Sequence, residues 1–218
     1  MYFFLGDLVA DDEAGMNKAG DERRTTVVKT ARCVCSVASW TCAAAHDDIS
    51  VAVALSGEVP EVAVALVAKG SITPESAAAA VASPFFLPAR DVGDRVALAA
   101  IVVPTHGRRA VRTVSVGGSR CVVLRRSGKT DVVSAATATF DAGDGDVFVA
   151  ATESFFAAYD RDRDLREAFD ALKTMDLDTI EAGAGVLPVQ MIAAVLSRPG
   201  LHLCDISVAA VVVRDRSR

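Results

Sequence analysis

Short Val- and Ala-rich runs, each ending near a Gly, Pro or Asp turn, recur along most of this chain. Apolar runs of this length are typical of buried β-strands, since a strand needs only about five residues whereas a helix usually needs more than ten. The runs of this kind are 49–55, 95–103, 110–116, 120–126, 129–139, 147–152 and 206–214. A stretch at 25–42, rich in Val, Thr and Cys, indicates one more strand or a hairpin. Burying so many strands on both faces requires a second sheet inside and helices outside.

Helical patterns lie on both sides of these strands. Residues 58–69 follow the strand at 49–55 with apolar side chains at helical spacing, and a second helix begins at Thr73-Pro74 and runs to about Ala82. Two further helices are expected at 164–172 and 188–196. The closely spaced strands from 95 to 126 predict an antiparallel meander. The expected fold class is therefore α+β: a four-layer αββα sandwich with two central, mostly antiparallel sheets.

The length favours one domain, because 218 residues can bury one sizeable core. Residues 1–24 are polar, acidic and without a sustained period, so they are expected to form an N-terminal arm. Residues 25–218 are expected to form a single domain, since no linker or internal repeat divides them.

Charge and hydropathy argue against several kinds of partner. A net charge of −5 gives no overall basic surface for nucleic acid, so any contact with nucleic acid is expected only indirectly, within a complex. The longest apolar runs, 96–103 and 208–213, are far shorter than the roughly 20 residues of a membrane-spanning helix. The opening Met1–Leu5 has no basic flank and is followed by acidic residues, which argues against a targeting signal. The expected location is the cytoplasm, with no membrane partner.

Five cysteines, an odd number in a chain of this size, favour reduced thiols over a disulfide framework. Cys33 and Cys35 should face the same side of one strand. Packing is favoured there over zinc binding, because no fourth ligand has a usable spacing.

Four local motifs stand in a fixed order along the chain. They are Val51-Ala52-Val53-Ala54-Leu55-Ser56-Gly57, Val116-Gly117-Gly118-Ser119-Arg120 before an apolar strand and a Gly turn, Gly145-Asp146 leading through a strand to Thr152-Glu153, and Cys204-Asp205-Ile206-Ser207 before a Val-rich strand. This order resembles the metal-dependent type 2C Ser/Thr protein phosphatases of the PPM superfamily. The resemblance implies a type 2C phosphatase-like form of the sandwich and covers roughly 49–214.

The resemblance also implies a chemistry that this chain departs from. Type 2C catalysis uses two divalent ions, typically manganese or magnesium, held by several aspartates, with a bridging water as nucleophile. At the corresponding degenerate positions this chain has Leu55 or Ser56, Gly118, Glu153 and Cys204, with Asp205 displaced by one residue. Hard cations prefer oxygen ligands, so these exchanges remove binding energy.

The sequence therefore predicts a pseudophosphatase with no metal and no cofactor, acting as a protein-interaction or structural subunit of a larger assembly. The alternative is a divergent active manganese- or magnesium-dependent phosphatase that uses Glu153, Asp205 and acidic residues of the arm. Phe85 and Phe86, between two prolines, are the expected partner contacts, although both rings could instead fill the core.

Overall fold

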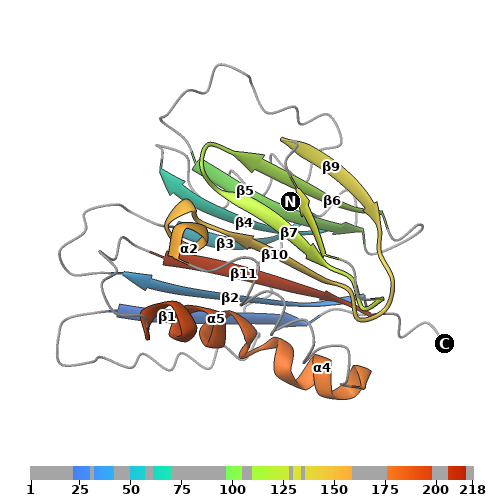
Figure 1. Cartoon of the computed structure of the whole chain (residues 1–218). Coiled ribbons are helices and arrows are strands. Elements are labelled where there is room, and N and C mark those ends of the chain that lie inside the picture. Colours follow the sequence, from blue (N-terminus) through green and yellow to red (C-terminus); the bar gives the residue numbers. More distant parts are fainter. Residues whose placement is uncertain are drawn as a thin grey trace.

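The computed structural model contains two antiparallel β-sheets packed face to face, with helices against one of them (Figure 1). The structure describes residues 22–29, 32–41, 50–56, 61–69, 97–104, 110–127, 130–133, 136–158, 176–197 and 206–214.

Sheet A has six strands in the order β1-β2-β11-β10-β7-β8. Its strands are β1 (Glu22–Lys29), β2 (Cys33–Thr41), β7 (Arg120–Leu124), β8 (Thr130–Val133), β10 (Val147–Ala151) and β11 (Ile206–Val213). Sheet B has five strands in the order β3-β4-β5-β6-β9. They are β3 (Ser50–Ser56), β4 (Glu61–Lys69), β5 (Ala97–Pro104), β6 (Ala110–Val116) and β9 (Thr137–Asp141). The expected α+β sandwich with two antiparallel sheets is confirmed.

Within the described ranges, three helices cover the outer face of sheet A: α2 (Glu153–Ala158), α4 (Leu177–Ala184) and α5 (Leu187–Leu196). Asp176 caps α4 by accepting a hydrogen bond from the backbone N–H of Thr179 at 2.7 Å. The hydroxyl of Ser36 on β2 donates to the carbonyl of Ala184 and ties the end of α4 to the sheet. Among the described helices, none is long and apolar enough by itself to span a membrane, and only α4 and α5 together, bent by 60°, pass that test.

The strands divide their side chains between two cores by simple alternation. Phe148 and Ala150 on β10 point between the sheets and meet Ile101 of β5, whereas Val147 and Val149 point toward the helices. The outer face of sheet B is also buried along β5, at Leu98, Ala100 and Val102.

Two parts of the expected topology are wrong. The helix expected at 58–69 is wrong for its described part, because 61–69 form β4, which pairs with β3 on one side and β5 on the other. Val62, Val64 and Leu66 alternate with Ala63 and Ala65, and this period of two, together with the valines, outweighs the helical spacing. The expected meander over 95–126 is also wrong after β6, because β7 belongs to sheet A and does not pair with β6. The run 129–139, expected as one strand, divides into β8 of sheet A and β9 of sheet B.

Several expectations lie outside the described residues. They are the helices at 73–82 and 164–172 and most of the 1–24 arm. β1 begins at Glu22 and so takes in the last residues assigned to that arm.

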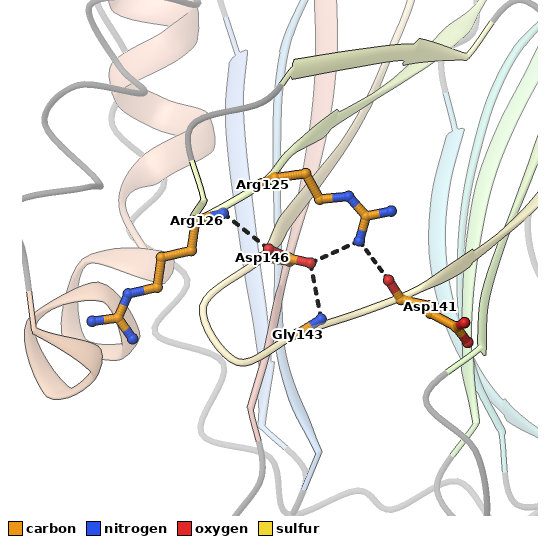
Figure 2. Close-up of polar contacts among 5 residues, drawn as sticks. All are labelled: Arg125, Arg126, Asp141, Gly143 and Asp146. Atoms are coloured by element: carbon orange, nitrogen blue, oxygen red, sulfur yellow. Dashed lines mark hydrogen bonds and ion pairs between the residues drawn. The ribbon is translucent and has the colours of Figure 1, made fainter.

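At one end of the sandwich, Arg125, Asp146 and Gly143 form a group of polar contacts that we call the clasp (Figure 2). The buried carboxylate of Asp146 accepts from Arg125 Nη1 at 2.8 Å, from the backbone N–H of Arg126 at 2.9 Å and from that of Gly143 at 2.9 Å. Arg125 also donates to the carbonyl of Asp141, at the end of β9. The clasp therefore links the ends of β7 and β10 in sheet A to sheet B.

Candidate functional site

The opposite end of the sandwich brings together three of the sequence motifs, and we call it the motif end. It consists of the β6–β7 turn (Gly117–Ser119), Thr152 and Glu153 after β10, and Ser207 at the start of β11. β10 pairs with β7 and β11 so that Ala151 lies opposite both Arg120 and Val208. The backbone N–H of Thr152 continues this ladder by donating to the carbonyl of Ser207 at 3.1 Å. Thr152 and Ser207, which are 55 residues apart in the sequence, therefore meet on adjacent strands.

At the β6–β7 turn, Glu153 packs against Gly118. Gly117 has a φ of 67°, in the left-handed region that favours glycine, and it lets the chain cross between the sheets. Gly118 has no such φ, but a Cβ on it would lie 1.9 Å from Oε2 and 2.8 Å from Cβ of Glu153. Glu153 thus occupies the space that a side chain at residue 118 would fill, which is where the resemblance places an aspartate.

Three hydroxyl side chains line up across β7, β10 and β11 at the motif end. Continuing the strand register places Ser119 and Ser207 on either side of Thr152, and all three are at most 1% exposed. The Oγ1 of Thr152 accepts from the backbone N–H of Ser207 at 3.3 Å. The Oγ atoms of Ser119 and Ser207 have no hydrogen-bond partner among the described residues. Phe148 and Ala150 on β10 belong to the inter-sheet core, and Thr152 follows them at the same spacing of two residues. The side chain of Thr152, and those of Ser119 and Ser207 beside it, therefore point between the sheets.

Other predicted site residues lie elsewhere. Leu55 and Ser56 lie at the C-terminal end of β3, where Ser56 pairs with Glu61. The motif end of sheet B is the other end of that sheet, where Leu98 pairs with Val116, next to Gly117. The seven residues from Ser50 to Ser56 span about 20 Å, so the structure does not bring Leu55 and Ser56 to Glu153.

The remaining predicted residues are only partly placed. Arg120 begins β7 and is exposed. Cys204, Asp205, Phe85 and Phe86 lie outside the described residues.

The residues placed at the motif end do not fit a two-metal centre. Within the described part of the chain, no group of three His, Cys, Asp or Glu side chains could hold a metal ion. Glu153 supplies one carboxylate, and its neighbours Ser119, Thr152 and Ser207 are neutral hydroxyls. Hard divalent cations are held by several charged oxygen ligands, which this arrangement does not supply.

The cysteines described by the structure serve packing. Cys33 and Cys35 both face the inter-sheet core, as their alternation predicted, with their sulfurs 3.6 Å apart. The contact with Cys33 and burial raise the pKa of Cys35 well above its usual value, and burial raises the pKa of Cys121 to about 11. All three side chains are fully buried, and the raised pKa values keep Cys35 and Cys121 as neutral thiols near pH 7.

Thr152 and Ser207 were not singled out by sequence reasoning. The sequence does contain one indication of them. A polar residue follows β10 directly and another lies at the start of β11, and such residues meet when the two strands are antiparallel neighbours. Their adjacency required knowledge of the strand order.

Solved structures of phosphatase domains share this fold. The phosphatase domain of the cell fate determinant SpoIIE from Bacillus subtilis matches with a TM-score of 0.57 and 12% identity, over 90% of this chain and 95% of that chain. RsbX in complex with magnesium matches with a TM-score of 0.54 and 14% identity, over 87% and 100%. The RsbU and RsbW domains of Rv1364c from Mycobacterium tuberculosis match with a TM-score of 0.54 and 13% identity, over 87% and 64%.

No family model matches the sequence, and no curated protein sequence matches it either. At these identities the structural likeness establishes the fold. The chain has the fold of the type 2C, or PPM-superfamily, phosphatase domains, as its motif order predicted.

Proposed function

We propose that this chain is a catalytically silent protein with a type 2C phosphatase fold, which acts as a protein-interaction or structural subunit of a larger assembly. The observation that carries the proposal is the contact between Glu153 and Gly118. The exposed carboxylate of Glu153 packs into the space of a missing side chain, and the neighbouring side chains of Ser119, Thr152 and Ser207 carry no charge.

Electrostatics explains why this arrangement disfavours a two-metal reaction. Two divalent ions about 4 Å apart repel each other by roughly 17 kcal/mol at an effective dielectric constant near 20. Several carboxylates must offset that repulsion and the lost hydration. Glu153, even if Asp205 joined it, supplies a charge of only −2 against +4. Hydroxyl oxygens add dipoles but no charge.

A hydrolysis assay tests the proposed silence. With a phosphopeptide or an aryl phosphate at millimolar manganese or magnesium, we expect no turnover above the buffer rate. Glu153→Ala and wild-type protein should give the same rate. Turnover that Glu153→Ala abolishes would instead support the alternative function, a divergent metal-dependent phosphatase that uses the exposed Glu153 carboxylate.

The proposed partner is another protein, bound through the 1–24 arm or the segment around Phe85 and Phe86. Support comes from composition, since two adjacent aromatic side chains between prolines are typical interface anchors. Phe85→Ala with Phe86→Ala should release proteins that co-purify from native cells while thermal unfolding stays unchanged. Unfolding of the double variant would show that the rings fill the core.

A further inference from the structure

The outer edge of β3 differs from the other sheet edges. Sheets A and B end in β1, β8, β3 and β9. β1 carries Glu22, Arg23, Arg24 and Lys29, β8 carries Asp131, and β9 carries Asp141. β3 reads Ser-Val-Ala-Val-Ala-Leu-Ser, with no charge, proline or glycine. Charged residues on edge strands normally prevent pairing with another chain, so β3 is the edge of these four that lacks this protection.

The sequence of β3 is nearly the same in both directions. Antiparallel pairing of two copies about Val53 places Ser50 opposite Ser56, Val51 opposite Leu55, and Ala52 opposite Ala54. A two-fold interface must be complementary to itself, and this register meets that condition at every position.

The register also keeps the two faces of sheet B continuous. Within the sheet, Val53 pairs with Val64, which pairs with Ile101 of the inter-sheet core. By this register, positions 51, 53 and 55 of β3 belong to the same face of the backbone ladder as Ile101, and positions 52 and 54 belong to the other face. In the paired arrangement, large apolar residues continue one face and alanines continue the other.

We propose that the outer edge of β3 is a two-fold dimer interface, at which β3 of a second copy pairs antiparallel about Val53. This pairing joins two copies of sheet B into one continuous sheet of ten strands. The assembly stops at two copies, because the β3 edge of each copy is used in the pairing and the remaining edges of the joined sheet are the charged β9 strands. It gives the proposed interaction role a specific partner and does not depend on catalytic silence.

The expected dimer is weak and reversible. Seven extended residues span about 24 Å, and a sheet layer about 10 Å thick gives roughly 500 Å² of buried surface from strand pairing. This is below the range of stable interfaces, so association should depend on protein concentration.

Two variants that change the same residues test the register. Ala52→Lys with Ala54→Lys places lysine opposite lysine twice across the two-fold axis. Ala52→Glu with Ala54→Lys places glutamate opposite lysine twice, with similar added bulk. Sedimentation at about 1 to 500 µM should show a concentration-dependent dimer for the wild type. The Lys/Lys variant should have a dissociation constant at least roughly tenfold higher than the Glu/Lys variant, and high salt should narrow that gap.

The measurement also has clear contrary results. A wild type that is monomeric over the whole range overturns the proposal, and so does a dimer that both variants form equally well. If either variant unfolds, amide hydrogen exchange of the wild type replaces this test. Alternate β3 amides should then gain protection as concentration rises, and unchanged exchange would count against the interface.

Discussion

Replacing Gly118 by alanine should strain the motif end through one identifiable neighbour. The new Cβ would lie 1.9 Å from Oε2 and 2.8 Å from Cβ of Glu153, whereas ordinary contacts begin at 3.4 Å. The carboxylate must therefore move by about 1.5 Å, which an exposed side chain does easily. The Cβ must move by about 0.6 Å, and this requires a shift of the backbone at the start of α2. Overpacking of this kind costs about 1–3 kcal/mol of unfolding free energy.

A double-mutant cycle isolates this contact. In a Glu153→Gly background both clashes are gone, so Gly118→Ala should be neutral, or stabilising by up to about 1 kcal/mol through the unfolded chain. In a Glu153→Ala background the Cβ contact remains and most of the cost should persist. Gly117→Ala is the matched control, because its φ of 67° should cost about 1–2 kcal/mol in every background. Urea unfolding followed by fluorescence of the one tryptophan gives these values. Equal costs of Gly118→Ala in all backgrounds would refute the proposed contact.

Two further predictions concern buried groups. Asp146→Asn should lower the unfolding free energy by about 1–3 kcal/mol, because an amide cannot accept all three hydrogen bonds that the Asp146 carboxylate accepts. Asp141→Asn changes an exposed carboxylate at the end of β9 and should alter the unfolding free energy by less than about 0.5 kcal/mol; equal effects of the two variants in urea titrations would argue against the clasp. The unfolding free energy should also fall as pH rises from about 9 toward 11, because the unfolded chain releases the proton of Cys121 near its usual pKa whereas the folded protein holds it to a pKa of about 11. Cys121→Ala should reduce this slope without removing it, because the raised pKa of Cys35 gives a slope of the same sign, and an unchanged slope would contradict the assignment.

Most strands could be predicted because short Val- and Ala-rich runs are typical of buried strands. The sheet to which each strand belongs could not be predicted from these runs. β7 and β8 belong to sheet A while β6 and β9 belong to sheet B, and nothing local in 110–141 marks the crossings apart from the Gly117-Gly118 turn. β4 was missed because Val62, Ala65, Leu66 and Lys69 fit a helical face, although the same segment also alternates with a period of two. Pairing with β3 and β5 decides between these patterns, and pairing is a tertiary property.

For the candidate site too, the sequence predicted some of the residues but not how they are arranged in space. Glu153 and the Gly117–Arg120 turn were found from motif order, and the structure brings Glu153 and Gly118 into contact. Linear order could not show that Leu55 and Ser56 lie near the other end of sheet B, nor that Ser119 and Ser207 flank Thr152. These relations depend on strand direction and register, which a motif match does not contain.

Titration calorimetry of the purified chain with manganese tests the central claim most directly. Among the residues that the structure describes, one carboxylate and three neutral hydroxyls lie at the motif end, so we expect no saturable heat at millimolar manganese, in wild type and Glu153→Ala alike. Saturable binding of two ions that Glu153→Ala abolishes, together with turnover of a phosphopeptide, would contradict the account and identify a divergent active phosphatase.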